Sequence, residues 1–379
     1  MSHQPLSGVR VLDFSTLLPG PMCSLLLAEA GAEVIKVERP ERGDEMRSYV
    51  PKFGSDSVNF ALLNRGKRSV TLDLKKEHDR QEALRLVTQS DVLIEQFRPG
   101  VMARLGLGYE DVRAHNPRLI YCSISGYGQT GPLANTAAHD LNYLAESGML
   151  ALSAGSDGAP VLPPALIADL GGGAYPAMMN ILLALRQRDA IGQGCNLDVS
   201  MADNLFPFMY WGLGNGWAAN QWPEPGADLV TGGTPRYQIY RTLDGRFLAA
   251  APLEQKFWEN FLAVLKAPEL LDDSQDPDGT RIRIAQRIAT ETAAEWERRF
   301  SGIDACVVVV KTLKEAVGHP HFRARGLFQR TVRHGELDIP ALPTPIDAAF
   351  RGTANTTLNY PQLGEANAQL LEPILKEKQ

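Results

Sequence analysis

The chain has 379 residues, a formal net charge of −6 and 44% hydrophobic residues. This length exceeds what one ordinary core organises and predicts about two domains. The acidic balance and the lack of a long basic run in the sequence exclude a generalised nucleic-acid surface. No apolar run approaches the roughly 20 residues needed to cross a bilayer, so we expect neither nucleic-acid nor membrane partners.

The four cysteines, at positions 23, 122, 195 and 306, are widely spaced and form neither a CxxC motif nor a cluster with histidine. Such scattered thiols are typical of buried or inert groups in a reducing compartment. The N-terminal segment lacks the basic and apolar regions of a secretory signal. These features predict a soluble, cytoplasmic protein.

The beginning of the chain has the pattern of a βαβ unit. A buried strand over Val9–Phe14 precedes an apolar helix over Met22–Ala30, and a second strand covers Ala32–Glu38. Such a unit predicts a parallel sheet. The turn at Gly20 does not spell GxGxxG, so the expected topology is Rossmann-like without a nicotinamide cofactor.

Strand and helix patterns continue to alternate after this unit. Strands are predicted over Ser69–Leu74, Asp91–Glu95 and Arg118–Ser125, and an amphipathic helix is predicted near Glu77–Gln89. The sequence therefore predicts a large α/β domain with helices packed on a parallel sheet.

Cationic residues follow several of these strands. Arg39, Arg98 and Arg104 come just after strand ends, where a doubly wound sheet collects ligands. The planar guanidinium fork pairs well with phosphate. The alternative is that these are solvated surface arginines, an interpretation that fits Arg65 and Arg68 at least as well.

Two proton-transfer groups, His139 and Asp169, lie in glycine-rich surroundings and are separated by 169 − 139 = 30 residues. Helical spacing after Asp140 places His139 at or just before a helix N-terminus. Asp169 precedes three glycines and an apolar run, so it is also expected at a helix start. Free backbone N–H groups around Asp169 and Leu170 could hold a developing oxyanion.

These features are the elements of a two-base site. The alternative is that His139 is a surface imidazole at a helix start and that Asp169 only caps the glycine-rich helix. The local pattern does not decide between the two interpretations.

A change of composition marks the second half of the chain. Residues 221–235 are rich in proline and glycine and predict a linker after the first part of the large domain, which covers residues 1–220. Residues 236–325 are expected to form a smaller α+β domain that opens with a β-hairpin around Asp244-Gly245. Residues 326–379 are expected to return to the large domain.

Several motifs resemble the type III CoA-transferase (CaiB/BaiF) superfamily over nearly the whole chain. They are Leu6–Leu12, Gly31–Pro40, Asn64–Ser69, Arg98–Gly100, Arg104–Leu107, Gly126–Pro132 and His319–Gly326. Within the superfamily the chain is most similar to the α-methylacyl-CoA racemases. Ala138–Tyr143 matches their Gly-His-Asp-Ile-Asn-Tyr motif with Ala138 in place of glycine, and Glu254 matches the racemase glutamate that pairs with this histidine.

The resemblance implies a Rossmann-like large domain, a smaller α+β domain and an interlocked homodimer whose sites draw residues from both chains. It implies His139, Asp169 and Glu254 as catalytic residues, with no metal or organic cofactor. It also implies a CoA thioester site, made of Arg39, Leu72, Asp73, Leu74, Lys75, Gln96, Phe97, Arg98, Arg104, Ala138, Asp140, Leu141, Asn142 and Tyr143.

The implied reaction interconverts (2R)- and (2S)-2-methylacyl-CoA, which requires an acid/base group on each face of C2. One alternative is a CoA transferase in which Asp169 is the nucleophile of a mixed anhydride and then of a CoA thioester. His139 and Glu254 have no clear task in that reaction. A second alternative is a catalytically silent CoA-binding protein.

Overall fold

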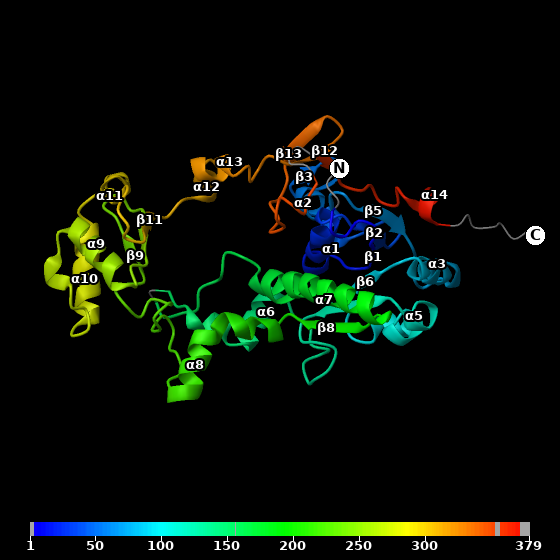
Figure 1. The fold of residues 1–379 in the computed structure, drawn as a ribbon, viewed down its shortest axis with the longest axis horizontal. Helices are drawn as coiled ribbons and strands as arrows, with labels where there is room; N and C mark the ends of the chain where they lie inside the picture. Colours follow the sequence, from blue (N-terminus) through cyan, green and yellow to red (C-terminus); the bar gives the residue numbers. More distant parts are fainter. Residues whose placement is uncertain (1–3, 156, 353–356, 372–379) are drawn as a thin grey trace, which may run out of the picture. The chain divides into compact units, whose positions relative to one another are not determined.

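The computed structural model describes residues 4–155, 157–352 and 357–371. The chain divides into two compact units (Figure 1). Unit 1 comprises Met1–Ser147, Pro163–Phe208 and Pro320–Gln379, and unit 2 comprises Gly148–Leu162 and Met209–His319. Unit 2 therefore includes residues 148–162 and 209–220, which the sequence analysis had assigned to the large domain, and it ends before residue 325.

Unit 1 is built on a six-stranded sheet whose strands are all parallel. In spatial order the strands are β5 (Arg68–Thr71), β2 (Glu33–Glu38), β1 (Arg10–Asp13), β6 (Val92–Glu95), β7 (Ile120–Ser125) and β8 (Asn196–Ser200). This is the strand order of a doubly wound sheet. In such sheets ligands bind at the carboxyl ends of the two central strands, here β1 and β6, where the strand order reverses. The predicted parallel sheet is confirmed, and β8 is a strand that the sequence analysis did not predict.

Helices cover both faces of this sheet (Figure 1). The helices α1 (Pro19–Glu29) and α7 (Tyr175–Ile191) pack on one face. The helices α3 (Glu77–Thr88), α4 (Val101–Arg104) and α5 (Tyr109–His115) pack on the other face. There, alternate strand residues such as Leu12 and Ile35 meet Leu86 of α3 in one buried core.

Shorter elements surround the sheet. They are η1 (Glu45–Ser48), β3 (Lys52–Phe53), β4 (Asp56–Ser57), α2 (Val58–Asn64), α6 (Asp140–Glu146), the π-helix η3 (Ala168–Ala174), η4 (Asp203–Met209) and α13 (Pro320–Ala324). The C-terminal part adds β12 (Thr331–His334), β13 (Leu337–Pro340), β14 (Thr357–Asn359) and α14 (Asn367–Leu370). The Ala366 N–H donates to the Ser69 carbonyl at 2.9 Å, so the start of α14 packs beside β5.

Unit 2 contains a three-stranded antiparallel sheet of β9 (Gln238–Arg241), β10 (Phe247–Ala250) and β11 (Val307–Val309). β9 and β10 form the predicted hairpin, with the Thr242 N–H donating to the Arg246 carbonyl at 2.9 Å across the turn. Its other elements are η2 (Met149–Leu152), α8 (Tyr210–Ala219), α9 (Gln255–Leu265), η5 (Pro268–Leu270), α10 (Pro277–Ile288), α11 (Ala293–Phe300) and α12 (Leu313–Val317).

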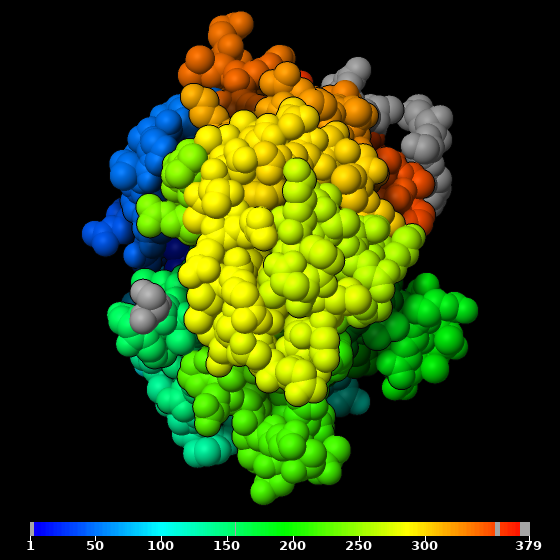
Figure 2. Space-filling model, turned by 90° about the vertical axis from the view of Figure 1, so that its left-hand side faces the viewer, coloured from blue at the N-terminus to red at the C-terminus, as the bar shows by residue number. Residues whose placement is uncertain are grey.

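Two buried tryptophans, Trp258 and Trp296, and the ring of Phe261 organise the core of unit 2. Figure 2 shows one face of this unit, in yellow-green to yellow, as a continuous surface.

None of the described helices is long and apolar enough to cross a membrane. Cys23 and Cys122 are buried as the sequence analysis expected, whereas Cys306 is exposed. Among the described residues, no group of three or more His, Cys, Asp or Glu side chains could hold a metal ion.

Candidate active site

The backbone around His139 is fixed from both sides. His139 is the N-cap of α6, and its N–H donates to Asn142 Oδ1 at 3.0 Å. The hydroxyl of Tyr143 donates to the carbonyl of Ala138 at 2.9 Å. The His139 side chain itself makes no capping hydrogen bond and is exposed. The predicted position at a helix N-terminus is confirmed, and the imidazole is available to a ligand.

Asp169 lies in the first turn of the π-helix η3, as predicted for a helix start. The glycines that follow it allow close packing against the end of β8. A β-carbon at Gly172 would lie 2.2 Å from the Met201 carbonyl oxygen, which no side chain tolerates. Glycine at this position therefore lets the helix that carries Asp169 lie directly on the backbone after β8.

His139 and Asp169 line the same cavity of about 380 Å³, here called the His139–Asp169 cavity. Six other predicted site residues also line it, namely Gln96, Phe97, Arg98, Ala138, Asn142 and Tyr143. Sequence reasoning missed Leu17, Pro19, Ser125, Gly126 and Thr136, which complete much of the lining. Met201, which the sequence offered as a pocket or core residue, is buried and also lines this cavity. Leu17 and Pro19 could have been found from the rule that the first βα loop of a doubly wound sheet borders the ligand site.

The electrostatics of this cavity favour a protonatable carboxyl group. Burial, followed by the charge of Asp140, raises the pKa of Asp169 to about 6, and His139 opposes this shift. Burial and the charge of Asp169 raise the pKa of Tyr143 to about 12. Asp169 can therefore exchange a proton near neutral pH, whereas Tyr143 remains a neutral hydrogen-bond donor.

The backbone N–H groups around Asp169 are already paired. The Asp169 N–H donates to Asp140 Oδ1 at 3.0 Å, and the Leu170 N–H donates to the Leu166 carbonyl at 3.2 Å. The prediction that these two N–H groups hold an oxyanion is therefore wrong. The sequence showed a helix start, but it could not show that a side chain from another helix occupies it.

A second cavity, of about 530 Å³, lies at the carboxyl ends of β1, β2, β5 and β6 and is here called the arginine cavity. Its lining includes the predicted residues Arg39, Leu72, Asp73, Leu74, Lys75, Phe97 and Arg104. Arg39 Nε donates to the Gly43 carbonyl at 3.1 Å. In the described part of the chain, no carboxylate pairs with Arg39 or Arg104, so both guanidinium groups can receive an anion.

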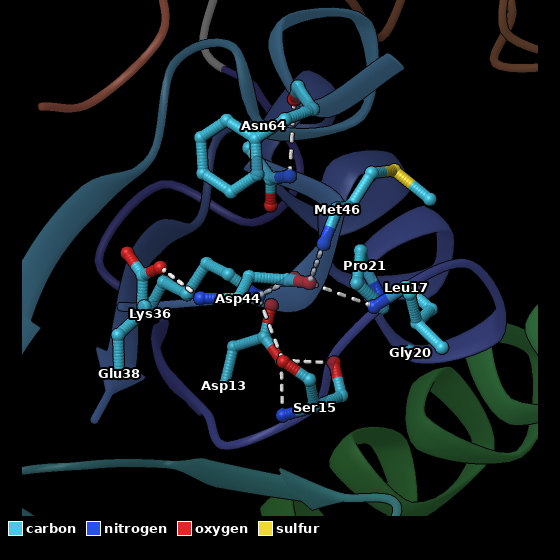
Figure 3. A network of polar contacts seen from close by, with 12 residues as sticks. Asp13, Ser15, Leu17, Gly20, Pro21, Lys36, Glu38, Asp44, Met46 and Asn64 are labelled. Carbon is cyan, nitrogen blue, oxygen red and sulfur yellow. Dashed lines mark hydrogen bonds and ion pairs between the residues drawn. The ribbon is translucent and has the colours of Figure 1, made fainter. Parts of the chain in front are cut away.

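A buried charge network supports the loop between these cavities (Figure 3). Asp13 and Lys36 converge with Asp44 beneath the loop that carries Ser15 and Leu17. Lys36 Nζ donates to the Ser15 carbonyl at 2.7 Å, and Asp44 Oδ1 accepts from the Leu17 N–H at 3.2 Å. The loop that contributes Leu17 to the His139–Asp169 cavity is thus held by charges that solvent does not reach.

Lys67 completes this network. Its Nζ lies 3.3 Å from Asp13 Oδ2 and also contacts the side chains of Ser24 and Asn64 at 2.7 and 2.8 Å. Burial lowers the pKa of Lys67 to about 8, against the opposing charge of Asp13. Arg65 is buried as well and pairs with Glu29 at 2.9 Å, so its interpretation as a solvated arginine is wrong.

Three predicted site residues line neither cavity. Asp140 is buried, and its Oδ1 accepts the N–H groups of Ala168 and Asp169. Leu141, on the first turn of α6, is 41% exposed. Glu254 is the N-cap of α9 in unit 2 and makes no side-chain capping bond.

Comparisons with known proteins show which family and which proteins this chain resembles. The sequence model of CoA-transferase family III matches residues 6–367. Alpha-methylacyl-CoA racemase of Homo sapiens is 38% identical over 346 residues, which cover 90% of this chain and 86% of the relative. Acetyl-CoA:oxalate CoA-transferase of Acetobacter aceti is 33% identical over 352 residues, with 90% and 89% covered. The crystal structure of a CAIB/BAIF family protein from Brucella suis matches with a TM-score of 0.81 and 28% identity, covering 96% of this chain and 97% of that one.

Proposed function

The chain belongs to CoA-transferase family III, and on that premise we propose that it is an acyl-CoA racemase or epimerase. It interconverts (2R)- and (2S)-2-methylacyl-CoA thioesters by removing the proton at C2 and returning one to the opposite face. The observation that supports this proposal is that His139 and Asp169 line one cavity and that the Asp169 carboxyl group titrates near neutral pH.

The reaction needs one base and one acid at the same carbon. With Asp169 ionised and His139 protonated, the carboxylate takes the C2 proton and the electron pair moves onto the thioester oxygen as an enolate. The imidazolium then returns a proton to C2 from the other face, which leaves neutral His139 and protonated Asp169. The opposite enantiomer uses the two groups in exchanged roles.

The raised pKa of Asp169 serves this exchange. A carboxyl group that titrates about 6 is closer in basicity to an imidazole than an ordinary aspartate is. Proton removal by the Asp169 carboxylate is therefore less unfavourable than proton removal by an ordinary aspartate.

The proposal also covers the binding of CoA and the role of Glu254. The phosphate groups of CoA bind in the arginine cavity against Arg39 and Arg104, and the thioester arm passes Phe97 to reach His139 and Asp169. Glu254 orients the imidazole and stabilises its charged form, from this chain or from the partner chain of a homodimer. No metal or organic cofactor takes part in this scheme.

The test uses a single enantiomer of a 2-methylacyl-CoA in deuterated water without an acceptor acid, followed at C2 by NMR and chiral analysis. We expect deuterium at C2 together with loss of optical purity. His139→Ala should slow racemisation by at least roughly 100-fold, as expected for loss of a general acid/base. His115→Ala removes an exposed histidine of α5 that lines neither cavity and serves as the matched control.

The competing proposal is CoA transfer with Asp169 as the nucleophile. The name of the Acetobacter aceti relative describes CoA transfer for that protein. The competing proposal predicts no exchange at C2, and transfer of CoA with release of the free 2-methyl acid only after an acceptor carboxylic acid is added. It also predicts that His139→Ala keeps most of the activity. Either result would overturn the racemase proposal.

A further inference from the structure

Asp140 connects the two segments that carry the proton-transfer groups. The residue is only 6% exposed. Its Oδ1 atom accepts the N–H of Ala168 at 2.7 Å and the N–H of Asp169 at 3.0 Å. These N–H groups open the π-helix η3, where the helix itself supplies no acceptor for them. One carboxylate oxygen of α6 therefore caps the helix that carries Asp169.

The other end of this connection is equally well defined. Asp140 directly follows His139 in the chain and is the first residue of α6. The hydrogen bonds from the His139 N–H to Asn142 and from Tyr143 to Ala138 prevent the backbone on this side from shifting. A rigid path of one residue thus runs from His139 through Asp140 to the backbone of Asp169.

We propose that Asp140 is a positioning residue whose carboxylate holds the turn that carries Asp169 against the helix that begins at His139, and so sets the spacing of the two proton-transfer groups. This inference rests on the proposed function for its catalytic meaning. The contact itself is independent of which reaction the pair performs. Asp140 lines neither cavity, so its contribution is made through Asp169 and not through the substrate.

Asp140 also acts on Asp169 through its charge. The negative carboxylate is, after burial, the second cause of the raised pKa of Asp169. The ionisable groups that interact with Asp169 are His139, Asp140 and Tyr143, all from α6 or its N-cap. The elements α1, α7, β7 and β8 also contact η3, and none of their described ionisable groups is among the causes of the shift.

Two substitutions separate the geometric role of Asp140 from its charge. Asp140→Asn keeps an oxygen that can accept both N–H groups but removes the negative charge. Asp140→Ala removes the acceptor as well. Asp203→Asn is the matched control, because Asp203 is exposed in unit 1 and its carboxylate has no hydrogen-bond partner among the described residues.

The first readout is amide hydrogen exchange of the segment 166–172 in the full-length protein, which needs no activity. We expect faster exchange in Asp140→Ala and near wild-type protection in Asp140→Asn and in the control. Unchanged protection in Asp140→Ala would overturn the proposal. If Asp140→Ala does not fold, Asp140→Ser replaces it, since its shorter side chain also cannot span the contact.

The second readout is the pH profile of kcat/KM for C2 exchange. Asp140→Ala should lower kcat by roughly 100-fold with little change in KM, as expected for misplaced reacting groups. Asp140→Asn should retain most of kcat. It should also move the acid limb of the pH profile to lower pH by roughly one unit, because the negative charge that raises the pKa of Asp169 has been removed. An equal loss of kcat in Asp140→Ala and Asp140→Asn would contradict a geometric role for Asp140.

The two readouts also distinguish failure of this inference from failure of the proposed function. If the wild-type protein exchanges no C2 proton, the racemase proposal fails while the hydrogen-exchange experiment still tests the contact. If the wild-type protein is active and Asp140→Ala matches it in exchange protection and in kcat, only the role of Asp140 is refuted.

Discussion

Lys36 Nζ lies 2.9 Å from Asp44 Oδ2, and neither side chain is exposed to solvent. The pair joins β2 to the loop that contributes Gly43, Asp44 and Glu45 to the arginine cavity. Removing one partner of a buried pair leaves an uncompensated charge and costs about 3 to 5 kcal/mol. We therefore expect Lys36→Met to lower the free energy of unfolding in urea by roughly this amount.

The control for this prediction is Arg333→Met. Arg333 pairs with Asp338 at 2.7 Å, but the two side chains are 49% and 35% exposed. A solvent-exposed pair contributes about 1 kcal/mol or less. Equal losses in the two variants would show that burial does not govern the strength of the Lys36–Asp44 pair.

The helix that carries Asp169 depends on a close approach at Gly172. In Gly172→Ala the new β-carbon would meet the Met201 carbonyl oxygen at 2.2 Å, so backbone must move. We expect a loss of about 1 to 3 kcal/mol in the free energy of unfolding, together with reduced activity because Asp169 shifts. Gly214→Ala, in α8, meets nothing within 4 Å and should be neutral or slightly stabilising. Calorimetric or urea unfolding that ranks the two variants equally would refute this account.

The raised pKa of Asp169 predicts a pH-dependent stability difference. The carboxyl group titrates at about 6 when folded, against an ordinary value of 3.8, so the folded state binds this proton more tightly. The stabilisation of the folded state by this bound proton is fully present at pH values below 3.8. It is lost as the pH rises through about 6. Asp169→Asn should therefore gain stability relative to wild type between about pH 4 and about pH 7, by on the order of 2 kcal/mol.

Urea unfolding of both proteins across this pH range provides the measurement. A difference that does not change with pH would mean that the Asp169 carboxyl group titrates normally. A difference that shrinks as the pH rises would mean that the pKa of Asp169 is lowered, and proton exchange by Asp169 near neutral pH would lose its support.

Arg104 and Arg39 offer the arginine cavity free donors for phosphate. Arg104→Ala should weaken the binding of CoA, measured by titration calorimetry, by roughly 10-fold, because a charge-assisted hydrogen bond is lost. Arg113→Ala removes an exposed arginine of α5 that pairs with Glu110 at 3.6 Å and lines neither cavity. Equal affinity of the Arg104 variant and the control would place the phosphate groups elsewhere.

Local sequence patterns predicted the elements that follow simple periodicity. The apolar strands around Leu12 and Ile35, the helix between them and the hairpin at Asp244-Gly245 all occur where their patterns indicated. His139 was correctly placed at a helix start because the apolar spacing after Asp140 is helical. Each of these features depends on neighbours within about ten residues along the chain.

Features that depend on distant contacts were not predictable in this way. A charged residue in a strand usually faces water, so nothing near Asp13 or Lys36 indicates burial until the loop at Asp44 is folded over them. Arg65 was misinterpreted for the same reason, since its partner Glu29 lies on α1. Asp140 was assigned to the thioester site by resemblance, yet its carboxylate binds a turn 28 residues further along the chain.

Phe97 is the one described residue that lines both the arginine cavity and the His139–Asp169 cavity. It therefore acts as a shared wall, and any change in its size alters both compartments at once. Under the proposed function, a substitution at Phe97 is therefore expected to affect both the binding of CoA and the reaction at C2. Arg104 and Met201, in contrast, each line only one of these two cavities, so a substitution at either position changes a single cavity. Under the proposed function, a substitution at Met201 is therefore expected to change the acyl side of the site without loss of the CoA binding that we propose at Arg104.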